Sequence, residues 1–549
     1  MDFVKPPNDL DPPSAPKGRK CKPKVVLTGF LLCLGIFFII GGILVLFHFR
    51  DLVNGIIKTK IPLRENSEVT QAWLSPPIKP QLKLYFFNMT NVEEFLLGSK
   101  PKLVEIGPYV YDEIWEKVDI RWYEHGEQVE YRQKKTYFFN PTASIGTEGD
   151  MLTLPNVPMI TAMGGKMKFA GRLVRLALGS MLDILKQKPF VSVSVKDVVW
   201  GYDHPLIKLG NDILPPEEKL PFDQFGFFVG KNASATSGLI RALTGIHDVR
   251  NVGQILTVDG KASLDIWKGE QCNEIRGTDG STFHPDISKN DTLYLFNKDL
   301  CQSLPLIYQK EIQMNGIPGF RFVPPKDVFS TPSENPQNQC FCLNEGGCLT
   351  PSGLFNMSAC QFGSPIMLSW PHFYQADPRL LETVEGLAPS EDLHQFFIDL
   401  QPKLGTGLRA SAKTQVNLVI SAVEDIKPAE GLRDIILPMV WFSDGIDGID
   451  DPDTVALLEA AVHTPETVRS IMYPLLLVLG SVLLILVALY LLKSRCNNNE
   501  QEFDVSVMQK SNNLNVGHRG ELDDFALKAY KNGTRSLHSR NGQIDDGYI

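Results

Sequence analysis

Six of the nine cysteines lie close together in the middle of the chain, where their thiols could form disulfides or hold a metal. Within 89 residues they are Cys272, Cys301, Cys340, Cys342, Cys348 and Cys360. Zinc sites favour C-x2-C pairs with histidines at set spacing, and neither accompanies these cysteines. An even number of clustered cysteines is typical of a disulfide framework in an oxidising compartment. We therefore expect disulfides and no metal, although spacing alone does not choose the pairing.

A second candidate for chemistry is the acidic run SDGIDGIDDPD near the end of the central region. Its carboxylates belong to Asp444, Asp447, Asp450, Asp451 and Asp453. The run lacks the EF-hand ligand order and the closing glutamate, so an exposed acidic turn is the better interpretation. The chain also lacks a G-x-S-x-G elbow, an H-E-x-x-H motif, a Walker loop and a G-x-G-x-x-G motif after a strand. We expect no enzymatic activity and no cofactor.

A cationic stripe is the third candidate. The segment Thr161–Lys188, closed by Pro189, reads as one amphipathic helix. Its apolar face contains Met163, Met167, Val174, Leu178, Met181 and Leu185. Its basic residues fall within about 40° of one line on the helix, at 100° per residue. They are Lys168, Arg172, Arg175 and Lys186. This stripe could bind an anionic ligand such as oxidised phospholipid or a lipoprotein surface, while an ordinary solvated helix face is left open.

Two long apolar segments flank the region that contains the cysteines, the acidic run and the cationic stripe. Val25–Phe47 has 23 residues without a charge, and Ile471–Leu492 has 22 residues. A helix needs about 20 apolar residues to cross the hydrocarbon core, so both predict membrane spans. The first exceeds the apolar region of a signal peptide and no small-x-small cleavage site follows it. We interpret it as an uncleaved signal anchor.

Charges and glycosylation sequons set the orientation. Basic residues crowd residues 17–24 before the first span, and Lys493 and Arg495 follow the second, which favours cytoplasmic flanks. Arg50, Lys58 and Lys60 just past the first span blur this rule, so the sequons decide the orientation. Of five sequons, four begin at Asn88, Asn232, Asn290 and Asn356, between the spans, and we interpret the fifth, at Asn532 in the tail, as a chance occurrence. We therefore expect both termini inside. Cys21 and Cys496 lie at the cytoplasmic face and are candidates for S-palmitoylation, with ordinary reduced thiols as the alternative.

The expected domain order has five parts: a cytoplasmic segment (1–24), a span (25–47), a glycosylated, disulfide-bonded extracellular domain (48–470), a span (471–492) and a disordered tail (493–549). The net charge is −9; the two cytoplasmic segments carry +3 and zero, so the remainder carries about −12, which argues against binding nucleic acid. The large domain is mostly β: residues 82–87, 129–139 and 190–195 show strand-like alternation or β-branched and aromatic content.

Five short words in the large domain carry a resemblance to a known family. They are Glu105–Tyr111 (EIGPYVY), Leu154–Pro158 (LPNVP), Trp200–Leu206 (WGYDHPL), Ile275–Ser281 (IRGTDGS) and Pro371–Asp377 (PHFYQAD). Together with the two spans, the sequons and the six cysteines, they make the chain resemble the class B scavenger receptors. The resemblance covers the chain from Lys24 to Lys493 and implies an ectodomain of mixed α+β type. Its expected core is an antiparallel β-barrel with a hydrophobic tunnel and an apical helical bundle.

The resemblance also implies a disulfide pairing and a function. The pairing is Cys272–Cys340, Cys301–Cys360 and Cys342–Cys348. The function is a receptor that binds lipid or lipoprotein at the cationic apex and passes fatty acid, sterol ester or carotenoid through the tunnel to the membrane. Expected partners are lipids, lipoproteins or other anionic particles and the membrane itself, and a homo-oligomer is left open.

An alternative function is a receptor for proteins or particles, through lysosomal sorting or recognition of apoptotic cells and microbes; a sensory lipid or pheromone receptor is a further alternative. The tail has no acidic dileucine signal, and Tyr530 does not begin a Y-x-x-Φ signal. This favours the plasma membrane, with a lysosomal or endosomal membrane as the alternative.

Overall fold

The computed structural model describes residues 23–213, 215, 219–235, 238–343, 348 and 350–514. The chain divides into two compact units. One contains the chain up to His48 and the chain from Arg469, and the other contains Phe49–Val468. These boundaries lie within two residues of the expected limits of the large domain, at 48 and 470.

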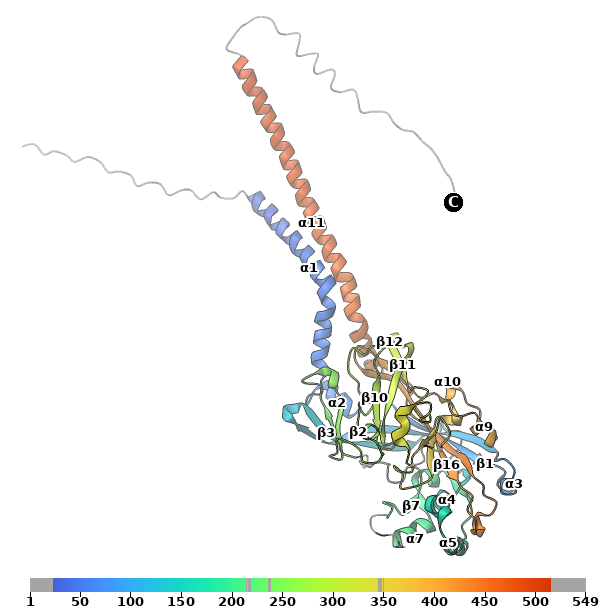
Figure 1. The fold of residues 1–549 in the computed structure, drawn as a ribbon. Coiled ribbons are helices and arrows are strands. Elements are labelled where there is room, and N and C mark those ends of the chain that lie inside the picture. The colour runs from blue at the N-terminus through green and yellow to red at the C-terminus, as the bar shows by residue number, and fades with distance from the viewer. Residues whose placement is uncertain are drawn as a thin grey trace, which may run out of the picture. The chain divides into compact units, whose positions relative to one another are not determined.

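Two long helices contain the predicted membrane spans (Figure 1). α1 comprises Pro23–Lys60 and α11 comprises Pro452–Leu514, and each is long and apolar enough to cross a membrane. Both helices continue beyond the predicted spans. The tail from Lys493, expected to be disordered, is helical as far as Leu514, because neither glycine nor proline interrupts this stretch. The predictions of a cytoplasmic segment before Pro23 and of a disordered tail after Leu514 fall on residues outside the described part of the chain.

Within the terminal unit, the two helices pack closely where glycines face the neighbouring helix. A Cβ atom on Gly35 would lie 2.9 Å from Leu484 Cδ2, and one on Gly480 would lie 2.7 Å from Ile39 Cγ1. The Arg469 guanidinium donates a 3.0 Å hydrogen bond to the Leu46 carbonyl. Because small residues let membrane helices approach closely, the two spans form a packed pair.

The unit Phe49–Val468 is built on a 13-stranded antiparallel sheet. In spatial order its main path is β10 (Leu293–Asn297), β11 (Gln302–Met314), β12 (Ile317–Val323), β15 (Phe397–Gln401), β16 (Thr406–Ile420), β17 (Ile435–Ile446), β1 (Gln81–Met89), β2 (Leu103–Tyr123), β3 (Gln128–Phe139), β8 (Ile240–Leu243) and β9 (Ile255–Val258). β13 (Phe355–Asn356) pairs with β14 (Ile366–Ser369), which pairs with β16. The strands predicted at 82–87 and 129–139 are β1 and β3.

The two ends of this path are joined by a short segment at residues 277–278. The Ile255 amide on β9 donates to the Gly277 carbonyl at 2.9 Å, and the Phe296 amide on β10 donates to the Thr278 carbonyl at 2.9 Å. Gly277 has φ +79°, and a side chain there would collide with the Tyr294 carbonyl, so this closure needs glycine. The sheet therefore closes on itself, which confirms the predicted antiparallel barrel.

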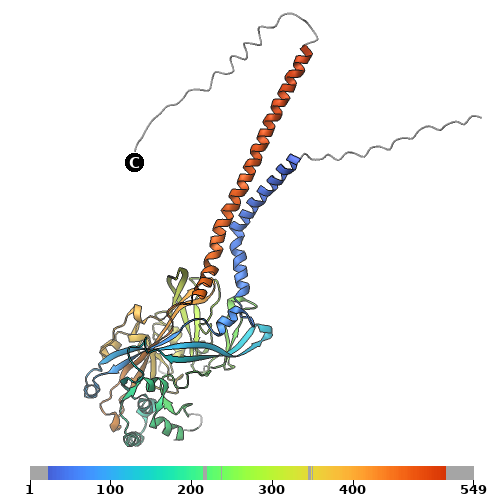
Figure 2. The ribbon, with the colours of Figure 1, turned by 180° about the vertical axis from the view of Figure 1, so that it is seen from behind.

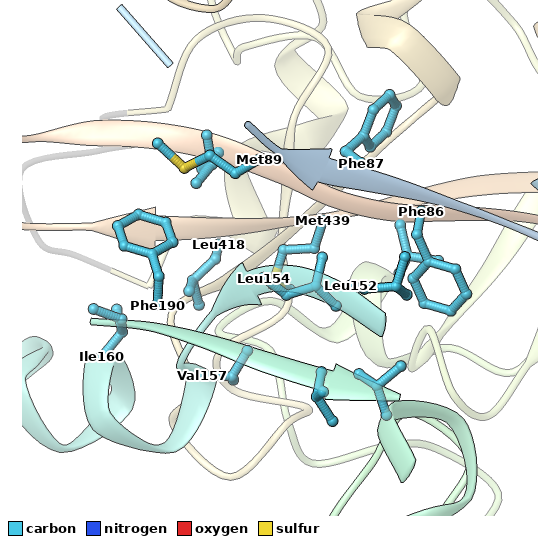
Figure 3. Packing of buried hydrophobic residues seen from close by; sticks show 14 of the residues in the cluster. Phe86, Phe87, Met89, Leu152, Leu154, Val157, Ile160, Phe190, Leu418 and Met439 are labelled. Carbon is cyan, nitrogen blue, oxygen red and sulfur yellow. The ribbon is translucent and has the colours of Figure 1, made fainter. Parts of the chain in front are cut away.

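The two faces of the sheet differ in character. Along β1, Leu82, Leu84 and Phe86 are buried in the main hydrophobic core, while the alternate residues Lys83 and Tyr85 lie on the opposite face. Figure 3 shows Phe86 and Phe87 directed to opposite sides of this strand. We call the face of Leu82 the core face and the face of Lys83 the outer face.

A helical region covers one end of the barrel (Figures 1 and 2). It contains the antiparallel pair of β4 (Met151–Pro155) and β5 (Phe190–Ser194), with α4 (Val157–Met163), α5 (Arg172–Ile184), α6 (Val195–Trp200) and α7 (Pro205–Ile213). Leu152, Leu154 and Val157 pack against Leu418 and Met439 of the sheet (Figure 3). The chain enters and leaves this unit at the opposite end, where Arg50 and Glu466 form a 2.9 Å ion pair. We call the helical region the apex.

The remaining elements are short. They are α2 (Glu68–Leu74), α3 (Val92–Leu96), α8 (Glu270–Asn273), α9 (Arg379–Thr383), α10 (Glu391–His394), β6 (Tyr202–Asp203) and β7 (Gln224–Phe225), with 3-10 turns η1 (Glu124–Gly126), η2 (Gly165–Phe169), η3 (Val249–Asn251), η4 (Pro336–Phe341), η5 (Pro371–Phe373) and η6 (Lys427–Ala429).

The prediction of one helix over Thr161–Lys188 is wrong. The segment breaks into the end of α4, the turn η2 and α5. Gly164 and Gly171 adopt extended backbone conformations and separate the three pieces. Glycine is a poor helix former, so these positions end the helix although the apolar periodicity continues through them.

Three disulfides join the six clustered cysteines in the pairing that the resemblance implies: Cys272–Cys340, Cys301–Cys360 and Cys342–Cys348. Cys272, Cys301 and Cys340 belong to a hydrophobic cluster that also contains Trp267 and Phe322. The first two bridges therefore fasten the loops between β9 and β14 to the barrel core.

Candidate functional site

The predicted cationic residues of the apex are mostly paired with carboxylates. Lys168 lies 3.1 Å from Asp434, and Arg172 and Arg175 lie 3.4 and 2.8 Å from Asp425. The hydrogen bond from Arg175 and the charge of Arg172 hold the pKa of Asp425 below its usual range. These aspartates come from the loop after β16, which sequence reasoning did not place here. The ion pairs neutralise much of the expected charge of the stripe.

The four predicted residues differ in exposure. Arg175 has only 18% of its side chain exposed and also donates to the Ala170 carbonyl, so it has a structural role. Lys168, Arg172 and Lys186 are exposed. Lys186 has φ +51° just after α5, and within the described part of the chain it has no ion pair. The broken helix therefore leaves separate cations around α5 and no continuous stripe.

The outer side of α5, together with the end of η2 just before it, carries an exposed apolar face that the sequence pattern did not reveal. Phe169, Leu173 and Ile184 are 87, 83 and 79% exposed. Leu176 is 42% exposed, and Val174, predicted to lie on the apolar face of the helix, is 52% exposed. The other residues of that predicted face are buried or pack against the core: Met163, Met167, Leu178, Met181 and Leu185. We call Phe169, Leu173, Leu176 and Ile184 the apical apolar face.

A pocket of about 580 Å³ lies on the outer face of the sheet. Seven consecutive strands, from β11 through β12, β15, β16, β17 and β1 to β2, contribute to its wall, and α10 lies at its rim. Its charged side chains are the cations Lys83, Lys310, Arg321, Arg409 and Lys413 and the carboxylates Glu105, Glu391, Asp392 and Asp447. A volume of this size is typical of small-molecule sites. We call it the outer pocket.

The floor of the outer pocket is an ion cluster around Asp399, which is almost fully buried. Arg321 donates two hydrogen bonds to the Asp399 carboxylate, of 2.7 and 2.8 Å, and Arg409 donates a third of 3.2 Å. Both guanidiniums also lie over the ring of Phe397, at 3.8 and 4.8 Å from its centroid. The cluster fixes the two arginines in place at the bottom of the pocket.

An aromatic wall closes one side of the pocket. The rings of Tyr85 and Trp441 stack at 3.8 Å, and Trp441 donates to Glu105 at 2.6 Å. His372 also bonds Glu105, at 2.5 Å. Burial disfavours the ionised carboxylate, but the hydrogen bonds from His372 and Trp441 outweigh it and hold the pKa of Glu105 below its usual value. Burial lowers the pKa of His394, stacked on His372, to about 4.

Lys413 lies in the outer pocket between the ion cluster around Asp399 and the aromatic wall. Among the residues that the structure describes, none forms a hydrogen bond or an ion pair with its amine, which lies 5.7 Å from the centroid of the Phe397 ring and is weakly attracted by Asp447. Burial, followed by repulsion from Arg321 and Arg409, lowers the pKa of Lys413 to about 8. The lysine is thus a partly buried cation in surroundings that are already positive.

A period-two pattern along β16 could have revealed this pocket. Arg409, Ser411 and Lys413 alternate with Ala410 and Ala412, and all three point to the outer face. The pattern continues into two residues that are fully buried, Gln415 and Asn417. Alternation of this kind in a strand of a large sheet indicates a lined polar face. The pocket contrasts with the hydrophobic tunnel that the resemblance implies, and the tunnel stays a prediction.

A small apolar crevice of about 10 Å³ lies beneath the apex. Leu154 and Val157 from the apex and Met439 from β17 are among its lining residues. It has room for about one water molecule. A lipid could therefore pass through the crevice only if the strand pair β4–β5 moved away from the large sheet.

The remaining predicted residues are distributed as follows. Asn232 and Asn290 are exposed, whereas Asn88 and Asn356 are partly buried. The side chains of Asn88, Asn232 and Asn356 each accept a backbone hydrogen bond. Cys496 is exposed on α11, and Cys21 lies outside the described residues. Glycosylation and palmitoylation stay predictions. In the acidic run, Asp444 forms an ion pair with Lys135 at 2.6 Å and Asp447 forms one with Lys83 at 2.6 Å. These two carboxylates therefore connect β17 and the residue that follows it to strands β3 and β1 of the barrel.

Comparisons with known proteins agree with the fold. The model of the CD36 family matches residues 33–491. The chain is 33% identical to Lysosome membrane protein 2 of Homo sapiens over 426 residues, which cover 77% of this chain and 86% of that protein. It is 32% identical to Scavenger receptor class B member 1 of Bos taurus over 471 residues, covering 85% and 90%. For Scavenger receptor class B member 1 of Mus musculus the identity is 34% over 412 residues, covering 74% and 79%.

Proposed function

Because the chain belongs to the CD36 family and is a two-span membrane protein, we propose that it is a scavenger receptor that captures lipid particles with the apex of its ectodomain. The captured lipid then moves through the barrel toward the membrane. The observation that carries this proposal is the apical apolar face, which covers the outside of α5 without a partner among the described residues.

The chemistry of this face suits a lipid surface. A helix that presents leucine, isoleucine and phenylalanine to solvent, with lysine and arginine at its edges, binds in the interfacial region of a lipid layer. Lys168, Arg172 and Lys186 supply the basic edge. Because Asp425 and Asp434 neutralise part of that charge, apolar burial contributes more to binding than the cations do.

The route from the apex begins at the crevice beneath β4–β5. Its walls are apolar, which suits the acyl chain of a lipid, and its small volume means that it is closed at rest. Each CH₂ group left in water costs about 0.8 kcal/mol, so a lipid moves through an apolar route more readily than through solvent. Transfer down this gradient needs no nucleotide.

We expect replacement of Leu173 and Ile184 by aspartate to weaken particle binding at least about tenfold, since each leucine or isoleucine buried in lipid contributes about 1.5–3 kcal/mol. The measurement is binding of phosphatidylcholine–phosphatidylserine vesicles to cells that display equal amounts of full-length protein. Ile145→Asp is the control, because Ile145 is 67% exposed but lies outside α5.

A second arm separates charge from apolar contact. Lys168→Glu with Lys186→Glu should weaken binding of vesicles that contain phosphatidylserine and leave pure phosphatidylcholine vesicles unaffected. Undiminished binding by the double aspartate variant would contradict apical capture. Lipids that co-purify with the full-length protein, identified by mass spectrometry, test the passage of lipid separately; a lipid-free preparation favours a receptor for protein ligands.

A further inference from the structure

We propose that the outer pocket binds the anionic head group, a carboxylate or a phosphate, of a lipid, with Lys413 and Arg409 as its counter-ions. The pocket is separate from the apical apolar face and opens on the outer face of the sheet, where only its aromatic wall, Tyr85 and Trp441, adjoins the main hydrophobic core. The choice of an anion rests on the pocket alone, and the choice of a lipid rests on the proposed function.

Lys413 is the first reason. A partly buried amine that faces three cations, Arg321, Arg409 and Lys83, and is attracted only by Asp447, with which it forms no ion pair, is unfavourable in the empty pocket. An anion placed beside it would remove this repulsion and satisfy the ammonium donors. Ion clusters that serve stability alone pair their charges, as Asp399 does with the two arginines, whereas an unpaired buried cation in a cavity is typical of a binding site.

The arginines supply directed donors beside that amine. Arg409 uses its Nε atom for Asp399, and its two Nη atoms have no hydrogen bond to other described residues. Its side chain is 37% exposed, compared with 11% for Arg321. Because Asp399 and Phe397 hold the guanidinium from below, Arg409 presents its free Nη atoms without further ordering.

The carboxylates of the pocket do not cancel this positive site. Glu105 is engaged by His372 and Trp441, and Asp447 is engaged by Lys83. Glu391 and Asp392 are exposed to solvent at the rim on α10, where water screens their charges. The unneutralised charge is therefore concentrated at Lys413 and at the outer atoms of Arg409.

Apolar surface beside the cations points to an amphiphile. The stacked rings of Tyr85 and Trp441 form the wall, and Leu393 and Ile446 belong to the lining. A free anion would leave this surface in water, whereas the first carbons of an acyl chain would cover it. The pocket volume of about 580 Å³ accommodates a head group with part of a chain.

The test is a binding assay on full-length protein in nanodiscs of neutral phosphatidylcholine, with oleate, oleyl alcohol and inorganic phosphate as probes. We expect oleate to bind more tightly than oleyl alcohol, which has the same chain without the charge. Lys413→Met should weaken oleate at least about tenfold and leave oleyl alcohol unchanged, while Lys413→Arg should restore most of the affinity for oleate.

Lys326→Met is the matched control, because Lys326 is exposed and does not line the pocket. Unchanged oleate affinity in Lys413→Met would overturn the proposal, and so would phosphate that displaces oleate at comparable concentration, which would identify a site for free anions. If oleate and oleyl alcohol bind equally well, only the anion site fails. If neither oleate nor oleyl alcohol binds, the pocket is not a lipid site and this proposal fails, whereas capture at the apex is decided separately by the vesicle assay.

Discussion

Replacing Asp399 with alanine is expected to lower the free energy of unfolding of the ectodomain by about 3–5 kcal/mol. The carboxylate is almost fully buried and accepts three hydrogen bonds from two guanidiniums. Without it, Arg321 keeps its charge in a site where only 11% of its side chain reaches solvent. The measurement is chemical unfolding of full-length protein in detergent, followed by tryptophan fluorescence.

Two variants show whether the loss comes from the unpaired charge. Asp399→Leu combined with Arg321→Met should cost less than Asp399→Ala, because removing both partners leaves no charge stranded beneath the pocket. Asp265→Ala breaks an ion pair with Lys261 in which both side chains are largely exposed, and should cost under about 1 kcal/mol. A double variant as unstable as Asp399→Ala would instead assign the loss to packing.

The elements that local sequence pattern specifies were predictable. Two apolar segments of sufficient length predicted the spans, and alternation predicted β1 and β3. The barrel was predicted only from the five short family motifs. Long-range strand pairing cannot be deduced from one sequence, so the resemblance to the family had to supply it. The closure of the sheet is an example: residues 277–278 connect β9 and β10, which lie at opposite ends of the strand order.

The apex shows where periodicity misleads. Apolar residues recur at helical spacing through the whole of Thr161–Lys188, yet Gly164 and Gly171 divide it. The glycines were visible in the sequence, and their low helix propensity was the signal that should have limited the helix. Asp425 and Asp434 were not predictable as partners of the stripe, because they come from a loop about 250 residues further along the chain.

The outer pocket was missed for a different reason. Its residues come from seven strands and from α10, and the densest stretch, residues 391–397, contains only six of the eighteen. Only β16 presents a readable pattern, in the alternation of Arg409, Ser411 and Lys413 with alanines. Even this pattern does not say what lies opposite; the register that places Lys413 beside Ser443 had to come from the fold.

The second large effect concerns a carboxylate on the core face of the barrel. Glu113 on β2 is fully buried, 3.4 Å from Lys135, which also pairs with Asp444 at 2.6 Å. Two carboxylates thus share one lysine, and Glu113 Oε1 and Asp444 Oδ1 have no hydrogen-bond partner among the described protein atoms. Burial, together with the negative charge of Asp444, raises the pKa of Glu113 to about 7.

The sign of the pH dependence follows from this shift. Because the pKa of Glu113 is higher in the folded state than its ordinary value of 4.5, the folded state binds this proton more tightly than the unfolded chain. The contribution of Glu113 therefore favours folding increasingly as the pH falls from about 7 toward 4.5. Above pH 7, the folded state has to hold a buried, incompletely paired charge.

We expect Glu113→Gln to raise the free energy of unfolding by about 1–3 kcal/mol at pH 8 and by far less at pH 5. Glutamine resembles the protonated carboxyl group in shape, its oxygen keeps the bond from the Trp115 indole, and Asp444 still pairs with Lys135. Glu116→Gln on the same strand is the control, since Glu116 is 38% exposed and should shift stability by under about 1 kcal/mol.

An equal effect of Glu113→Gln at both pH values would show that the charge of Glu113 is not the source of the cost in stability. Acidification to pH 5 would then leave the contribution of this position to stability unchanged, whereas the predicted result makes that contribution more favourable at pH 5 than at pH 8.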